Sequence, residues 1–350
     1  MVNGRRISQL LMSSTLLAHA LGQPPPSESS GVDGALVFAT PGTFAFNPRS
    51  IRPRPRALAG NVFHFTSITI EKGVTLTLSA KSLTGPVFWL SQGPVRIEGN
   101  IILDGENGEE SASLPSAPGA GGYGGGSRGH AGYGPSPFVA NEFLVPLVGG
   151  AGGAGGTRCA GGAGGGAILI ASSVSMVLNG TISANGGSAS EGCGAGGGGA
   201  IRLVAPVIDG AGRLSAQGGS AGSGQGRVRL ETLANYFTGS SETPTAVGKP
   251  LGLFLPPDPP ASVRIVSVDG VEWGLSSGTI HRSASVAVVV EARFIPPGTV
   301  IQLEFFSESG VVHAVSTTPL EGTLERSHAT ASVVFPSGLS HSQARVAWRR

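Results

Sequence analysis

Apolar and polar residues alternate in short runs along most of the chain. Residues 62–70 and 74–78 alternate with a period of two, which is typical of half-buried β-strands, and the polar residues before Gly73 predict a turn between them. Further short apolar runs follow at residues 85–90, 95–97 and 99–105. The pattern predicts an all-β protein built from many short strands.

A short block of sequence occurs twice. Gly-Thr-Ile-Ser-Ala-Asn-Gly-Gly-Ser-Ala at residues 180–189 returns as Gly-Arg-Leu-Ser-Ala-Gln-Gly-Gly-Ser-Ala at residues 212–221. Each copy follows a strand-like run, at 166–170 and 199–203, and a degenerate earlier copy occupies residues 85–105. Repeats of this kind indicate stacked units that bury their apolar faces only against one another.

Alignment of the copies places apolar residues at two equivalent positions of a strand. The first position holds Val87, Ile168, Ile201 and Val228, and the second holds Trp89, Ile170, Leu203 and Leu230. Side chains two residues apart share one face of a strand, so we expect both sets to point inward and to stack as ladders. The position between them, held by Phe88, Leu169, Arg202 and Arg229, is expected to point outward. This register predicts a parallel β-helix, or solenoid.

Polar residues recur as well. Asp104, Asn185 and Gln217 occupy a further equivalent position, and glycine follows each of them. We expect these residues to lie at a corner of the solenoid and to bond to one another or to the backbone. This structural role is favoured over a catalytic one, because two of the three side chains cannot ionise.

A long glycine-rich excursion, residues 108–165, separates the first copy of the repeat from the second. Glycine supplies 58 of the 350 residues, and it lets backbones approach one another closely. We therefore expect the excursion to pack as extended segments against the solenoid. Its Gly-Gly-Ala triplets are typical of polyproline II geometry, although they are too brief for collagen. The apolar island at 138–148 is expected to anchor the excursion to the core.

The composition divides the chain into five parts. Residues 1–22 are predicted to be a signal peptide, because Arg5 and Arg6 precede a short apolar run and the small-residue site Ala-His-Ala at 18–20. The remaining parts are a Pro/Arg-rich N-terminal segment at 23–60, a glycine-rich β-helix at 61–236, a linker at 237–260 and an immunoglobulin-like β-sandwich at 261–350. No other apolar stretch is long enough to span a membrane, so the mature chain is predicted to be secreted or cell-surface, extracellular or periplasmic.

Cys159 and Cys193 occupy nearly equivalent positions on successive copies of the repeat. Adjacent strands lie about 4.8 Å apart, which is compatible with the Cα separation of a disulfide, and an exported protein meets an oxidising compartment. We predict one disulfide that joins consecutive repeats. A metal pair or a reactive thiol is the alternative, but no neighbouring histidine supports either.

Several kinds of chemistry lack their sequence signals. A net charge of +2 is too small to indicate nucleic-acid binding. The glycine tracts lead into strands and no Gly-Lys-Ser or Gly-Lys-Thr follows them, so they do not predict a nucleotide site. The histidines have no metal-ligand spacing, and the acidic residues at 104–110 are interpreted as a solvated loop tip. We therefore predict no catalytic residues, no metal site and no cofactor.

An anionic ligand is the one binding function that the repeats predict. Arg202 and Arg229 occupy equivalent outward positions, and Arg213 lies on an intervening strand. A row of arginines can bind uronate or phosphate groups through paired hydrogen bonds. Neutralisation of these arginines by Glu231 and by solvent is the alternative, and the favoured one.

The strand sequences at 65–70, 73–76, 85–91, 166–172 and 199–206 resemble the glycine-rich secreted parallel β-helix proteins of environmental bacteria, here with an immunoglobulin-like module added. The resemblance covers roughly residues 60–232 and implies a fold but no activity, because that group is functionally uncharacterised. The expected function is that of an extracellular structural or adhesive protein without catalysis. The alternative is a protein that binds or degrades polysaccharide as a lyase or hydrolase, and the expected partner is a cell-envelope or extracellular polysaccharide.

Overall fold

The structure is a computed structural model in which residues 27–48, 59–110, 114–134, 141–220, 223–256, 262–272, 285–307, 312–334 and 340–345 are described. The predicted signal peptide and all of the arginine-proline stretch at 49–56 lie outside these residues. Apart from one 3-10 turn, η1 (Ala59–Asn61), the regular elements of the described residues are all β-strands.

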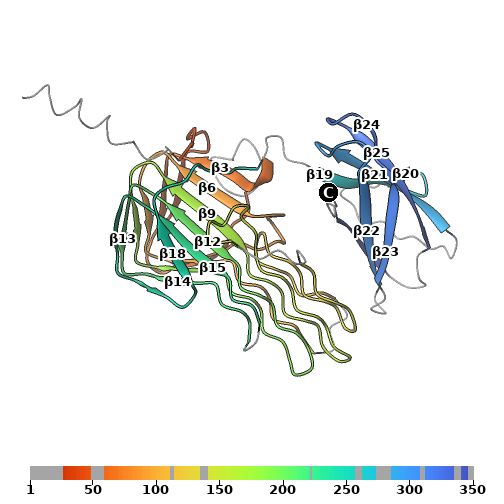
Figure 1. The fold of residues 1–350 in the computed structure, drawn as a ribbon, viewed down its shortest axis with the longest axis horizontal. Coiled ribbons are helices and arrows are strands. Elements are labelled where there is room, and N and C mark those ends of the chain that lie inside the picture. Colours follow the sequence, from red (N-terminus) through yellow and green to blue (C-terminus); the bar gives the residue numbers. More distant parts are fainter. Residues whose placement is uncertain are drawn as a thin grey trace, which may run out of the picture.

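The N-terminal part of the chain is a β-helix made of three parallel six-stranded sheets (Figure 1). The first sheet contains β1 (Ala35–Phe38), β4 (Ser67–Ile70), β7 (Val95–Ile97), β10 (Met176–Leu178), β13 (Val207–Gly210) and β16 (Ala234–Phe237). The second contains β2 (Gly42–Ala45), β5 (Val74–Thr77), β8 (Asn100–Ile102), β11 (Thr181–Ser183), β14 (Arg213–Ser215) and β17 (Ser240–Ser241). The third contains β3 (Val62–Phe65), β6 (Val87–Ser91), β9 (Ala167–Ser172), β12 (Ala200–Val204), β15 (Arg227–Glu231) and β18 (Thr245–Gly248). Each coil contributes one strand to each sheet in turn.

The predicted ladders are present in the predicted register. Ile168 pairs with Val87 on one side and Ile201 on the other, and Ile201 pairs with Val228. The set that contains Trp89 and Ile170 is in register in the same way. Both ladders lie in the interior of the coils, where they join the inward residues of the other two sheets in one hydrophobic core. The parallel β-helix predicted from the repeat is therefore confirmed.

The β-helix extends further at both ends than the sequence predicts. Residues 23–60 are predicted as a separate segment, yet β1 and β2 within them form the first coil and pair with β4 and β5. Residues 237–260 are predicted as a linker, yet β17 and β18 complete the last coil. A terminal coil has a neighbour on one side only, and its strands do not carry the apolar repeat of the interior coils.

The alternation at residues 62–70 also belongs to two strands rather than one. Phe63 and Phe65 are buried on β3, and Ile68 and Ile70 are buried on β4. The spacing between Phe65 and Ile68 is three residues instead of two, because the chain turns a corner there and enters another sheet. This single irregular interval is the sequence signal of the corner.

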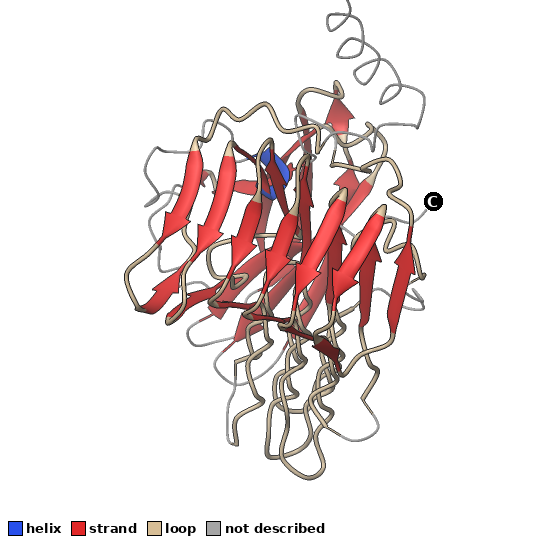
Figure 2. Cartoon of the chain, turned by 90° about the vertical axis from the view of Figure 1, so that its left-hand side faces the viewer, coloured by secondary structure: helices blue, strands red, loops and turns tan. Residues whose placement is uncertain are grey.

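The loops that join the second sheet to the third form a bundle of extended segments on one side of the β-helix (Figure 2). Residues 160–166 lie at its centre. Their successive N–H groups donate in rotation to three other segments, which are residues 103–109, 123–126 and 194–197. The acceptors, in order from Ala160 to Gly166, are the carbonyls of Glu109, Gly126, Gly194, Glu106, Tyr123, Gly197 and Leu103, at 2.7–3.0 Å.

This threefold rotation distinguishes the bundle from a sheet, in which successive residues face only two neighbours. A period of three residues without internal hydrogen bonds is the geometry of a polyproline II helix, as the Gly-Gly-Ala triplets indicate. A Cβ atom added at Gly164 would lie 1.8 Å from the carbonyl oxygen of Gly150, and one at Gly162 would lie 2.0 Å from that of Gly187. Neither glycine has a positive φ, so glycine is required here by close packing rather than by backbone conformation.

The C-terminal part of the chain contains two antiparallel sheets, which confirm a β-sandwich. One sheet has the order β20–β19–β21–β25–β24 and the other β23–β22–β26. The bounds are β19 (Ser262–Val268), β20 (Val271–Glu272), β21 (Ser285–Arg293), β22 (Val300–Ser307), β23 (Val312–Pro319), β24 (Glu321–Gly322), β25 (Ser327–Val334) and β26 (Ser340–Arg345). Apolar residues of both sheets, such as Val288 and Leu303, share a second core. The strand order is compatible with an immunoglobulin-like sandwich, and that finer topology stays a prediction.

Candidate functional site

The outer face of the third sheet is buried, which changes the environment of two predicted ligand-binding arginines. Leu144 and Leu147 of the excursion, together with Leu253 and Leu255 beyond the last coil, pack on its outward residues. The predicted anchoring role of the apolar island is therefore confirmed for Leu144 and Leu147. Every residue of β6, β9 and β12 is buried as a result.

Arg202 and Arg229 lie side by side under this cover, as their aligned positions predict. The side chain of Arg202 is only 1% exposed and that of Arg229 only 7%. Both guanidinium groups bind the buried carboxylate of Glu231, with Nε to Oε1 distances of 2.9 Å for Arg202 and 2.7 Å for Arg229. Arg229 also donates to the carbonyl of Glu142.

These contacts bear out the favoured alternative, neutralisation by Glu231, for Arg202 and Arg229, and they leave no open anionic-ligand face at these two residues. The carboxylate of Glu231 already binds both guanidinium groups, and it also accepts a hydrogen bond from the backbone N–H of Leu251 at 2.8 Å. Arg213 lies on β14 in another sheet, where its side chain is half exposed and forms an ion pair with Glu242 at 2.6 Å. The structure does not bring the three arginines together. The sequence predicts that the apolar island anchors the excursion, but not that it covers this face, because Leu144 and Leu147 lie far from Arg202 along the chain.

The polar corner has the predicted structural role. Asp104 accepts a hydrogen bond from the backbone N–H of Asn185 at 2.7 Å, and Asn185 accepts one from the backbone N–H of Gln217 at 2.8 Å. Ser215 donates to the same amide oxygen of Asn185. These side chains therefore join three successive coils through hydrogen bonds.

The two cysteines form the predicted disulfide. Cys159 and Cys193 are bonded, with their Cα atoms 6.2 Å apart. Cys159 follows the segment 149–156 and Cys193 precedes the segment 194–199, so the bond joins two neighbouring segments of the glycine bundle.

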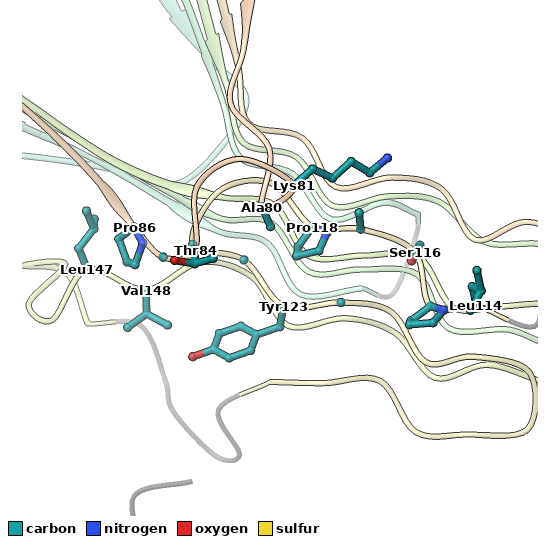
Figure 3. Close-up of a pocket in the computed structure, with 16 residues that line it drawn as sticks. Ala80, Lys81, Thr84, Pro86, Leu114, Ser116, Pro118, Tyr123, Leu147 and Val148 are labelled. Carbon is teal, nitrogen blue, oxygen red and sulfur yellow. The ribbon is translucent and has the colours of Figure 1, made fainter. Parts of the chain in front are cut away.

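A groove of about 860 Å³ lies beside the glycine bundle (Figure 3). Three stretches of chain form its walls: the loop before β6, residues 114–124 of the excursion, and Leu147 with Val148. Pro86, Pro118 and Leu147 supply apolar walls. Tyr123 supplies an aromatic ring, and Figure 3 shows Lys81 at the opposite wall. The segments that form its walls carry no repeat or motif, so the sequence does not predict this groove.

Hydrogen bonds and an ion pair hold the walls of the groove in place. Lys81 forms an ion pair with Glu106, and the other carboxylate oxygen of Glu106 accepts from the backbone N–H of Ala117 at 3.1 Å. Ser116 donates to the carbonyl of Gly161 at 2.6 Å, and the backbone N–H of Tyr123 donates to Gly150. The groove is therefore preformed on the rigid bundle.

The described lining of the groove is mostly apolar, and its polar side chains are those of Lys81, Thr84, Ser116 and Tyr123. Glycoside hydrolysis uses two carboxylates on either side of the bond, whereas the lining of the groove, among the described residues, contains no Asp or Glu. Glu110 of the acidic stretch accepts from Ser190 at 3.3 Å and is exposed. Within the described ranges, no three His, Cys, Asp or Glu side chains are grouped as a metal site.

The fold and the groove define an all-β protein in which a parallel β-helix carries a glycine bundle and precedes a β-sandwich. No protein-family model, curated protein or solved structure matches the chain significantly. In the part of the chain that is described, no helix has both the length and the hydropathy needed to cross a membrane.

Proposed function

We propose that this chain is an extracellular structural or adhesive protein in which the β-helix serves as a rigid support. The glycine bundle is the observation that carries the proposal. Its segments are fixed by hydrogen bonds to several neighbours and joined by a disulfide. A surface that is rigid before it meets a partner loses little conformational entropy on binding, which suits adhesion.

The polar groups of the β-helix support a role without catalysis. Glu231 is occupied by two arginines, Asp104 by the polar corner and Glu106 by Lys81 and Ala117. General acid–base catalysis needs a titratable group that can reach a bound substrate. These carboxylates are used to hold segments together, which supports a binding role over a lyase or hydrolase role.

Polysaccharide binding in the groove is the second candidate function, and Tyr123 is the observation that favours it. An aromatic ring beside proline walls offers an apolar platform for the face of a sugar. In Figure 3 the labelled lining residues follow the extended segments of the bundle from Leu147 to Leu114, and such an elongated arrangement suits a polymer.

One experiment tests both candidates. The purified chain is incubated with a panel of neutral and acidic polysaccharides, and new reducing ends and unsaturated products are measured beside co-sedimentation with the insoluble polymers. We expect sedimentation with at least one polymer and no products. Product formation that continues through successive turnovers would refute the proposed function. Secretion is tested separately, by N-terminal sequencing of the protein recovered outside the cells.

The groove is tested by Tyr123→Ala, with Tyr236→Ala as its matched control. Tyr236 lies on β16, is 62% exposed and does not line the groove. If the groove binds the polymer, Tyr123→Ala reduces sedimentation and Tyr236→Ala does not. Thermal unfolding of both variants identifies any loss that comes from the fold.

A further inference from the structure

The outer face of the five-stranded sheet in the sandwich carries a cluster of basic side chains that surrounds one carboxylate. Arg264 on β19 and Arg293 on β21 each place a guanidinium nitrogen 3.0 Å from Oε1 of Glu291. Arg326, in the turn before β25, places one 2.7 Å from Oε2. Nε2 of His328 lies 3.7 Å from the same oxygen. We call these four basic residues and Glu291 the arginine cluster.

The strand register explains why these residues meet. Val288, Val290 and Ala292 point into the core from β21, so the alternating residues Glu291 and Arg293 point outward. Cross-strand pairing places Arg264 opposite Glu291 on one side and His328 opposite it on the other. Directly paired residues of antiparallel strands share one face of the sheet, so the cluster spans three neighbouring strands (Figure 1).

The cluster carries more positive charge than its carboxylate neutralises. Three guanidinium groups contact Glu291, which has a single negative charge. The side chains of Arg264, Arg293 and Arg326 remain 64%, 50% and 60% exposed, whereas Glu291 has no exposed area. The arginines therefore cover the carboxylate as one layer, and their other N–H donors face solvent. Glu321, opposite His328 on β24, and Glu325 in the turn are exposed acidic neighbours at this edge, so the positive charge belongs to the guanidinium groups themselves and not to the edge as a whole.

The strands beside the cluster present a flat surface. The outward positions next to it hold Val289, Ala287 and Ser285 on β21 and Thr330 and Ser332 on β25, and the two serines share a hydrogen bond. None of these side chains is long, so the sheet leaves room for an extended polymer rather than forming a pocket for a small ion. Exposed guanidinium groups and a flat approach are thus found on the same face.

We propose that the arginine cluster binds an acidic polysaccharide through its carboxylate or sulfate groups. Guanidinium groups form paired, charge-assisted hydrogen bonds with such anions, and Glu291 competes with the ligand for part of their charge. The choice of a polysaccharide rests on the proposed extracellular adhesive function, and the site itself rests on the charge and the flat face. It differs from the predicted row of Arg202, Arg213 and Arg229.

The test measures binding of the full chain to two probes, polygalacturonate for carboxylate and dextran sulfate for sulfate, with neutral dextran as the blank. We expect binding to at least one charged probe, weakened by salt because exposed charges are screened. The variant Arg264→Gln/Arg326→Gln keeps Arg293 on Glu291 and should lose affinity on the order of tenfold for each arginine. Arg96→Gln is the matched control, because Arg96 is also half exposed and paired to a carboxylate, but lies on the β-helix.

A second variant distinguishes a change in binding from a loss of fold. Glu291→Gln removes the negative charge at the centre of the cluster and should strengthen binding to the charged probes, a gain that misfolding cannot produce. Weakened binding by this variant, with the fold intact by circular dichroism, would overturn the proposal. So would equal binding by the wild type and the double arginine variant, or tighter binding to duplex DNA or to phosphatidylglycerol vesicles than to either polysaccharide.

Adhesion to insoluble polysaccharide is measured in parallel on the same proteins. If the wild type and the double variant adhere equally, the arginine cluster is not the site and the adhesive function stands. If the wild type adheres to no polymer and binds neither charged probe, the adhesive function fails as well.

Discussion

At the scale of single residues, the glycines of the bundle are selected for their volume. Gly162 and Gly164 have ordinary backbone conformations that other residues adopt without strain. A methyl group at either position would nevertheless overlap a carbonyl oxygen of a neighbouring segment. Because hydrogen bonds in several directions fix those segments, they cannot move apart locally to make room.

Gly164→Ala is therefore expected to destabilise the protein by about 3 kcal/mol or more, since overpacking against a fixed backbone is costly. The control is Gly224→Ala, at a glycine of a neighbouring loop where an added Cβ would meet no atom within 4 Å. Denaturant unfolding of both variants is the measurement. Equal stability of the two variants would contradict the packing argument.

The second residue-scale feature is the buried carboxylate of Glu231 between Arg202 and Arg229. Glu231→Gln leaves two buried guanidinium groups without a counter-charge, so the free energy of unfolding should fall by about 3 kcal/mol or more. Glu242→Gln provides the comparison. Its partner Arg213 is half exposed, and breaking an exposed pair costs roughly 1 kcal/mol or less. If the two variants unfold at the same denaturant concentration, Glu231 does not hold the cover of the third sheet.

At the scale of elements, the repeated strand positions can be predicted from the sequence, whereas the segments outside the repeat cannot. The register of Ile168 with Ile201 follows from the repeat, because identical coils must stack identical positions. The burial of Arg202 does not follow, because leucines outside the repeat cover the face of the sheet on which it lies. Likewise, the strands of the first and last coils lack the repeat that identifies the inner coils. The groove is a product of irregular segments, and no local pattern predicts it.

The disulfide joins two segments, and its contribution to the free energy of unfolding can be measured. A covalent link between residues separated by 34 positions restricts the unfolded chain, and its removal in Cys159→Ser/Cys193→Ser should cost about 4 kcal/mol by the chain-entropy argument. Mass spectrometry of the native protein before and after reduction checks the bond itself. Two alkylated thiols in the unreduced protein would contradict it.

At the scale of the whole molecule, two hydrophobic cores share no residue. One fills the β-helix and the other fills the sandwich. Each core is closed by its own sheets, so we expect two calorimetric unfolding transitions. Gly164→Ala should then lower the transition of the β-helix and leave that of the sandwich in place.

Acid should act on the sandwich transition through Glu291. Burial raises the pKa of this carboxyl, but the hydrogen bond from Arg293 and the charges of Arg264 and Arg326 outweigh it and lower the pKa from 4.5 to about 2. A carboxyl with a lowered pKa stabilises the fold above its unfolded pKa, and that contribution is lost as the pH falls from about 4.5 towards 2. The stability difference between wild type and Glu291→Gln should shrink over this interval. A difference that does not change with pH would contradict the assignment.

The crowding of the glycine bundle also bears on how this protein can evolve. A position where every larger residue collides with a backbone is held constant by geometry, so an invariant glycine in related sequences would report packing and would imitate the conservation of an active site. Ala151 and Ala154, by contrast, are exposed on the same bundle. Such positions are free to diversify, and new surface specificities can arise there while the scaffold beneath them stays unchanged.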